Sequence, residues 1–143
     1  MATTNAHLAL ETVAGDGLRF VVTDDRGLTL ALDSGPDATA PSPTEALLAA
    51  LGACTGMDVI GILRKQRQEV TAYTIELIGQ RRDEHPRAFT AIEVVHRLTG
   101  RGLRRSAAED ALELSETKYC SIHATLAPGV VITSRLEILE DGA

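Results

Sequence analysis

The two cysteines are the residues of this chain best suited to redox chemistry. Cys54 lies inside a long apolar run from Leu47 to Leu63, and Cys120 lies where a second helical pattern ends. A single buried thiol usually behaves as an inert small hydrophobe, whereas two thiols can form and break a disulfide. Cys54 and Cys120 stand 66 positions apart and form no Cys-x-x-Cys motif, so only the tertiary fold could bring the sulfurs together.

Two other motifs suggest different chemistry near Cys120. Cys120 and His123 have Cys-x-x-His spacing, and Cys54 could be a third metal ligand, but the sequence offers no evident fourth ligand. Ser115 and Lys118 match the Ser-x-x-Lys pattern of β-lactamases, but the chain is short for that fold and lacks the companion segments. We therefore favour thiol chemistry and expect neither a metal nor a bound cofactor.

Composition excludes several functional classes. A chain of 143 residues with 44% apolar and 24% charged residues fits a single domain, residues 1–143, with one core. A net charge of −6 and 3% aromatic residues argue against nucleic-acid binding. The first residues lack a secretory signal, which predicts a cytoplasmic protein, and in that compartment a transient catalytic disulfide is more common than a permanent one.

Short strands are expected before a central helix. Residues 1–33 contain three strand-like runs separated by turn sequences, which predicts a three-stranded meander. After a Pro- and Gly-containing linker, Ser42 is a good N-cap, Pro43 fits the first helical position, and Glu45 completes a capping box. The predicted strands are His7–Val13, Leu18–Thr23 and Leu28–Leu32.

The helix expected over residues 42–68 would be roughly 37 Å long at the usual rise per residue. Its centre is apolar on nearly every face, and one small sheet could not cover all of it. We therefore expect a homodimer that buries the helix between subunits. A membrane span is not expected, because Gly52, Gly56 and Asp58 interrupt the apolar run.

Residues 70–143 are expected to form a hairpin, a second helix and two final strands. The order βββ-α-ββ-α-ββ lacks regular βαβ alternation, which predicts an α+β fold with an antiparallel sheet packed on two helices. Alternation of apolar and polar residues marks the hairpin, and helical spacing marks the helix. The predicted elements are strands Val70–Arg82 and Ala88–Thr99, helix Leu103–Lys118, and strands Ser121–Leu126 and Val130–Leu139.

The segments around the two cysteines resemble those of the OsmC/Ohr family, the osmotically induced and organic-hydroperoxide-resistance proteins. The resemblance covers essentially the whole chain and is closest to the OsmC-like branch of uncertain substrate. It implies an intertwined α+β homodimer with the long helices at its centre and active sites at the subunit interface. The segments that carry it are 41–54, PSPTEALLAALGAC, 116–121, ETKYCS, and 80–90, QRRDEHPRAFT.

The resemblance also implies a thiol-dependent peroxidase that acts in oxidative stress defence. Cys54 would attack an organic hydroperoxide or hydrogen peroxide and become a sulfenic acid, and Cys120 would then form a disulfide with it. An external dithiol, such as a lipoyl or thioredoxin-type protein, would reduce that disulfide.

The resemblance further implies an arginine from the N-terminal strands that stabilises the developing oxygen charge, held by a glutamate near the start of the cysteine helix. Glu45 matches the glutamate position, but nine residues at 100° each place it opposite Cys54 on a regular helix, and its other reading is the capping-box carboxylate. Arg19 is a better candidate for the arginine than Arg26, which lies in a turn, and the other interpretation of Arg19 is an outward-pointing strand residue. Asp58, one turn after Cys54, is read as structural or as a holder for an arginine.

A non-catalytic function is the alternative to the peroxidase. In that case the fold would bury both thiols, and the dimer would bind a small apolar molecule beside the long helices. A fold by itself does not decide between these functions.

Overall fold

The structure is a computed structural model that describes residues 1–142. It divides into two compact units, Met1–Leu47 and a second unit that begins at Leu48. Each unit is described by itself, and the assignment of residues 1–143 to one domain stays a prediction.

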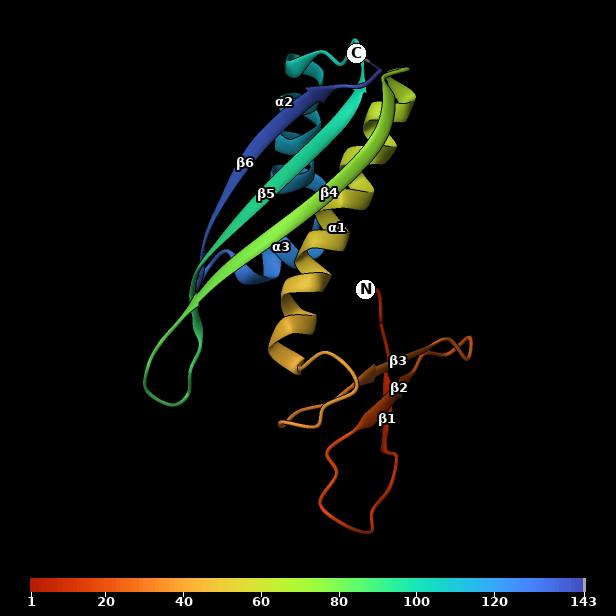
Figure 1. Cartoon of the computed structure of the whole chain (residues 1–143), viewed down its shortest axis with the longest axis vertical. Helices are drawn as coiled ribbons and strands as arrows, with labels where there is room; N and C mark the ends of the chain where they lie inside the picture. The colour runs from red at the N-terminus through yellow and green to blue at the C-terminus, as the bar shows by residue number, and fades with distance from the viewer. Residues whose placement is uncertain (143) are drawn as a thin grey trace. The chain divides into compact units, whose positions relative to one another are not determined.

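The first unit contains the expected meander. Strands β1 (His7–Leu10), β2 (Phe20–Thr23) and β3 (Thr29–Leu32) form an antiparallel sheet in that order (Figure 1). Asp24 shapes the β2–β3 turn, since its Oδ1 accepts hydrogen bonds from the backbone N–H groups of Arg26 and Leu28. The predicted strands are correctly placed but longer than the observed ones.

Helix α1 (Pro43–Lys65) begins with the predicted capping box. The Ser42 backbone N–H donates to Glu45 Oε1 at 3.0 Å, and the Glu45 backbone N–H donates to Ser42 Oγ at 3.3 Å. The helix ends before the predicted Gln68, because Arg67 adopts a left-handed backbone conformation with φ of 58°.

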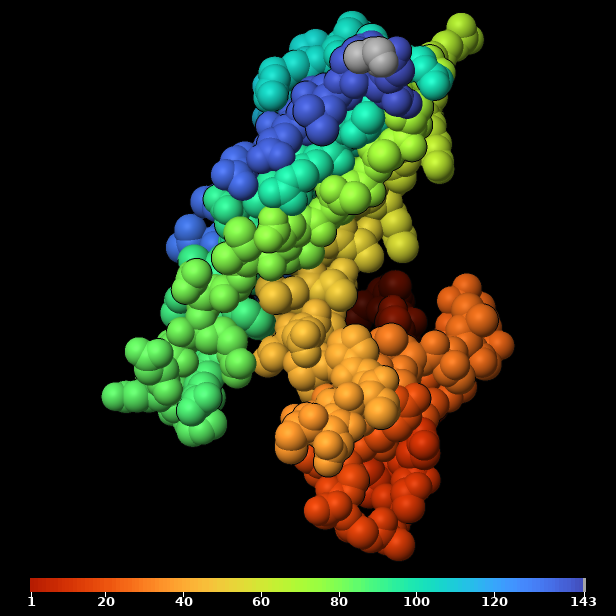
Figure 2. Space-filling model, in the orientation of Figure 1, coloured from red at the N-terminus to blue at the C-terminus, as the bar shows by residue number. Residues whose placement is uncertain are grey.

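The second unit contains a three-stranded sheet in which β5 is central. The expected hairpin is confirmed, since β4 (Glu69–Arg81) pairs antiparallel with β5 (Phe89–Arg101). Strand β6 (Val131–Glu140) pairs with β5 in parallel, so the prediction of a purely antiparallel sheet is wrong. The chain returns through helices to the start of β5, and such a crossover produces a parallel pair. The three strands form adjacent bands in Figure 2.

The strand predicted at Ser121–Leu126 is also wrong, because this segment is helix α3 (Ser121–Leu126). Cys120 caps it, since its sulfur accepts a hydrogen bond from the His123 backbone N–H at 3.3 Å. Ile122 and Leu126 then lie one turn apart and pack on the same core cluster. Their four-residue spacing was the helical signal in the sequence.

The core lies between the sheet of the second unit and the helices that pack on it, of which α1 is the longest. Gly52 and Gly56 permit close packing on β4: a Cβ at Gly52 would lie 2.6 Å from Leu77 Cδ1, and a Cβ at Gly56 would lie 2.7 Å from Ile75 Cδ1. These glycines therefore serve helix-on-sheet packing. The most fully buried large side chains are Leu51, Leu63, Ile92, Leu98, His96, Val59, Val94, Val95 and Ser115.

Helix α1 is long and apolar enough, by length and composition alone, to cross a membrane. The expectation that Gly52, Gly56 and Asp58 would exclude a membrane span by composition is therefore not met. Only 28% of its most apolar 18-residue window is buried within the chain. Most of this apolar window is therefore not buried within residues 1–142.

Candidate active site

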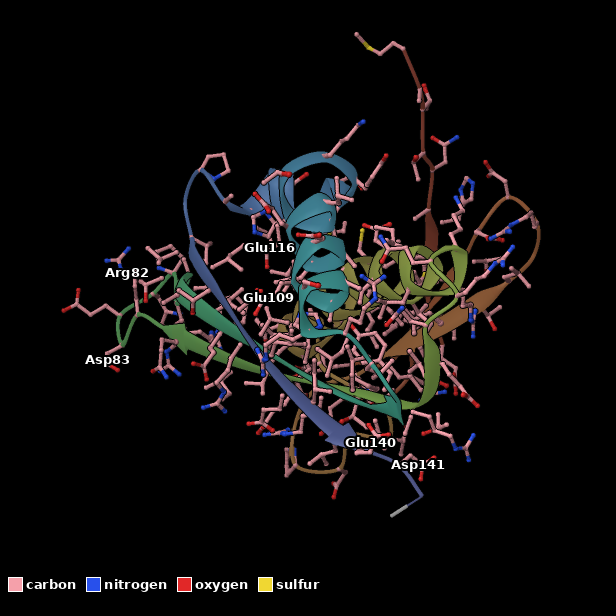
Figure 3. The ribbon with its side chains drawn as sticks, turned by 90° about the horizontal axis from the view of Figure 1, so that it is seen from above. Arg82, Asp83, Glu109, Glu116, Glu140 and Asp141 are labelled. Atoms are coloured by element: carbon pink, nitrogen blue, oxygen red, sulfur yellow. The ribbon has the colours of Figure 1, made fainter. Side chains whose placement is uncertain are left out.

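A local change of helix type positions Cys120. Helix α2 (Arg105–Leu114) continues directly into the π-helical turn η1 (Ser115–Tyr119), so the helix predicted over Leu103–Lys118 is confirmed but changes its winding. The turn closes when the Cys120 backbone N–H donates to the Ser115 carbonyl at 2.7 Å. Single π-turns are frequent at functional sites. Figure 3 shows Glu109 and Glu116 along this continuous segment, and Ser134 Oγ of β6 donates to the Glu116 carboxylate.

Three reactive side chains converge between α1 and the end of η1. The sulfurs of Cys54 and Cys120 and a carboxylate oxygen of Asp58 all lie within 4.8 Å of one another. Both cysteines are free thiols. Cys54 is half-buried, whereas Cys120 is only 3% exposed. The fold therefore brings together two thiols that lie 66 positions apart in the sequence.

Cys120 occupies a poorly solvated position. Burial is the largest cause that raises the pKa of its thiol, and the hydrogen bond with Cys54 raises the pKa further. Two donors oppose this effect: the His123 backbone N–H, and the Thr55 hydroxyl, which donates to the Cys120 sulfur at 3.6 Å. Cys120 is therefore held as a protonated thiol more firmly than an exposed cysteine would be.

Asp58 is held by a buried serine. Ser115 Oγ donates to Asp58 Oδ2 at 2.8 Å, and Ser115 is 0% exposed. Within residues 1–142 no lysine, arginine or histidine forms an ion pair with Asp58. The hypothesis that Asp58 holds an arginine therefore has no arginine partner in this part of the chain.

The two rival motifs have structural roles here. Cys120-x-x-His123 forms the cap of α3, and the His123 side chain is not part of the cluster that Cys54, Asp58 and Cys120 form. Of the Ser-x-x-Lys pair, Ser115 binds Asp58, while Lys118 Nζ lies 5.3 Å from the centre of the Tyr119 ring.

Glu45 is engaged as a cap. The Ser42 backbone N–H is the largest cause that lowers the pKa of Glu45, followed by the Ser42 side chain. This geometry matches the capping-box reading of Glu45, and its role at the thiols stays a prediction.

Arg19 has partners within the first unit. Its Nε donates to Glu11 Oε2 at 2.7 Å, and its Nη1 donates to Thr39 Oγ1 at 2.9 Å. The guanidinium is thus held in place by one carboxylate and one hydroxyl. Its assignment as the catalytic arginine stays a prediction.

Thr55 and Ser115 belong to the site although no sequence motif marked them as part of it. Thr55 directly follows Cys54 in the chain, and Ser115 belongs to a motif that was considered for another chemistry. Neither position carries a local signal for its partner, because the contacts Thr55 to Cys120 and Ser115 to Asp58 both join α1 to η1 and its end.

A cavity of about 540 Å³ adjoins the cluster at Asp58. Its lining combines apolar side chains with the polar groups of Asp58, Lys65 and Gln66. A small apolar molecule would fit such a mixed cavity. The remaining lining residues are Met57, Gly61, Ile62, Leu114 and Tyr119.

Comparisons with known proteins agree on one fold. A family profile described as "OsmC-like protein" matches residues 35–135. Protein YhfA of Escherichia coli strain K12 is 39% identical over 124 residues, which are 87% of this chain and 92% of YhfA.

Solved structures extend this similarity. The crystal structure of a hypothetical protein from Aquifex aeolicus VF5 aligns with a TM-score of 0.85 and 30% identity, over 99% of this chain and 100% of that one. The organic hydroperoxide resistance protein OhrB of Bacillus subtilis aligns with a TM-score of 0.60 and 19% identity, over 95% of this chain and 98% of that one. At this identity the OhrB alignment shows a shared fold and nothing more.

Proposed function

The chain belongs to the OsmC-like family, and from that premise we propose that it is a thiol-dependent peroxidase that reduces organic hydroperoxides. The observation that carries the proposal is the convergence of the free thiols of Cys54 and Cys120 beside a cavity. Neighbours of the same fold include proteins named for organic hydroperoxide resistance. The role in oxidative stress defence is part of this proposal.

The different environments of the two thiols suggest their order of reaction. Cys54 is the more accessible, so its thiolate attacks the distal peroxide oxygen, the O–O bond breaks, and the alcohol leaves with the proximal oxygen. Cys54 is then a sulfenic acid. Cys120, buried and with a raised thiol pKa, is less suited to meet the peroxide first and takes part in the second step, in which its sulfur attacks Cys54 and water leaves.

The disulfide requires only a small movement. The sulfurs lie within 4.8 Å, and a disulfide bond is about 2.05 Å long, so the sulfurs must approach by less than about 3 Å. Rotation of side chains next to the irregular turn η1 can supply part of this movement. In the proposed cycle an external dithiol of the lipoyl or thioredoxin type then restores both thiols.

The leaving oxygen needs a cation or hydrogen-bond donor as charge develops on it. Arg19 is the proposed source of this cation, with Glu45 as the carboxylate that orients it. Glu11 and Thr39 hold the Arg19 guanidinium by hydrogen bonds, which supports the part of the proposal that neighbouring side chains orient it.

A homodimer in the cytoplasm is the proposed assembly. Ala49, Ala53 and Met57 form an exposed apolar strip on α1 that lines a groove together with side chains of β4, and Met57 is 71% exposed. A second copy of α1 would cover this strip. Met57→Glu should convert the dimer to monomer in sedimentation measurements, and an unchanged dimer would contradict this interface.

The peroxidase is tested with a panel of organic hydroperoxides and hydrogen peroxide. Reduced protein should lose two thiols per chain, and mass spectrometry should show a Cys54–Cys120 disulfide. Cys54→Ser should abolish peroxide consumption. Equal first-turnover rates in the parent and Cys54→Ser would refute the assignment, and inertness of the parent toward the whole panel would favour the non-catalytic apolar-ligand dimer.

A further inference from the structure

We propose that the reduced Cys54–Asp58–Cys120 cluster also binds one thiophilic divalent cation of the Zn²⁺ type. Its three ligand atoms already lie within 4.8 Å of one another. In a tetrahedral zinc site with Zn–S bonds of about 2.3 Å, neighbouring sulfurs are about 3.8 Å apart. The cluster therefore needs only small rotations to close on a metal ion.

The ligand types select the class of ion. Two thiolate sulfurs and one carboxylate oxygen suit Zn²⁺ and similar borderline or soft cations, whereas Mg²⁺ and Ca²⁺ require sites built from oxygen. Three protein ligands leave the fourth tetrahedral position for water. The ligand set uses Asp58 in place of His123, because the ring nitrogens of His123 are not among the ligand atoms that lie within 4.8 Å of one another.

The side chains around the cluster favour the binding of a cation. Asp58 is half-buried and has no ion-pair partner within residues 1–142. Its Oδ2 is fixed by the buried Ser115 hydroxyl at 2.8 Å, the kind of outer hydrogen bond that orients carboxylate ligands. Thr55 gives similar support to the Cys120 sulfur. A bound divalent cation would offset the negative charges of the Asp58 carboxylate and of the two thiolates.

Metal binding and oxidation would compete for the same sulfurs. Binding of the cation releases one proton from each thiol. A hydroperoxide that oxidises the loaded site forms the disulfide, takes up two protons, yields one alcohol and one water, and expels the divalent ion. This release step rests on the proposed peroxidase, whereas metal binding by the reduced protein does not.

The test uses Co²⁺ as a spectroscopic probe of the reduced full-length protein under anaerobic conditions. We expect one Co²⁺ per chain, with the intense visible bands of tetrahedral cobalt and thiolate-to-cobalt charge-transfer absorption. Added Zn²⁺ should remove both signals. Absence of a stoichiometric tetrahedral spectrum in the folded, reduced protein would overturn the proposal, whatever the result of the peroxide assays.

Variants identify the ligands. Cys54→Ser and Cys120→Ser should each lose the two-thiolate charge-transfer absorption, and Asp58→Asn should lower Co²⁺ affinity. Ser115→Ala should weaken binding about 10- to 100-fold through the Asp58 carboxylate. The matched control is Asp110→Asn, at an exposed carboxylate of α2, which should bind Co²⁺ as the parent does.

Two results would reject this ligand set. Unchanged Co²⁺ affinity in Asp58→Asn would exclude the carboxylate ligand. Loss of the cobalt spectrum in His123→Gln would point instead to the Cys-x-x-His ligands. Circular dichroism of each variant shows whether the loss of binding reflects the site or the fold.

Discussion

His96 should make folding stability depend on pH. It lies in the core of the second unit, 1% exposed, where its Nδ1 is 2.6 Å from the Tyr73 hydroxyl and its Nε2 has no hydrogen-bond partner. Burial lowers the pKa of His96 from 6.5 to about 4, and burial raises the pKa of Tyr73, so both side chains are neutral at pH 7.

The sign and size of the effect follow from proton linkage. Below pH 6.5 the unfolded chain binds a proton at His96 that the folded chain does not bind, so stability falls as pH falls from 6.5 to about 4. The full loss is about 3 kcal/mol for a shift of this size, and about 2 kcal/mol of it should be lost by pH 5. Above about pH 8 His96 should contribute almost no slope, because the histidine of the unfolded chain is then neutral as well.

The assay is urea unfolding of the parent and His96→Gln at several pH values and one fixed protein concentration, because dimer stability depends on concentration. Glutamine stays neutral, so the difference in unfolding free energy between the two proteins isolates His96 from acidic groups that titrate lower. The control is His85→Gln, at an exposed position between β4 and β5. A parent-minus-variant difference that is constant from pH 7.5 to 4.5 would refute the reasoning.

Four further substitutions test the site and its packing. Cys120→Ser should complete one turnover and then accumulate sulfenic or over-oxidised Cys54, detected by mass spectrometry, and sustained turnover with a dithiol would contradict the resolving role. Arg19→Gln should slow peroxide consumption about a hundredfold with little change in the melting temperature, and an unchanged rate would remove Arg19 from the mechanism. Gly61→Ala should stabilise α1 by about 0.5–1 kcal/mol, because a Cβ at this position meets no atom within 4 Å. Gly52→Ala should destabilise the fold by about 1–3 kcal/mol, because the new Cβ would clash with Leu77. Equal effects of the two substitutions in thermal unfolding would disprove the packing argument.

The sequence by itself determined the local elements of this protein. The capping box at Ser42 and Glu45 placed the start of α1, and alternation of apolar residues placed the β4–β5 hairpin. These features depend on hydrogen bonds and side-chain periodicity between residues close in sequence, which local patterns record. The two cysteines likewise indicated thiol chemistry, since the residue type alone sets which nucleophile a side chain can offer.

The tertiary structure alone decided how the site is assembled. The meeting of Cys54, Asp58 and Cys120 depends on packing between α1 and the segment that ends in η1. The parallel pairing of β6 depends on the return path of the intervening helices. Such contacts join residues far apart in the chain, and their free energy arises from packing that no local sequence pattern contains.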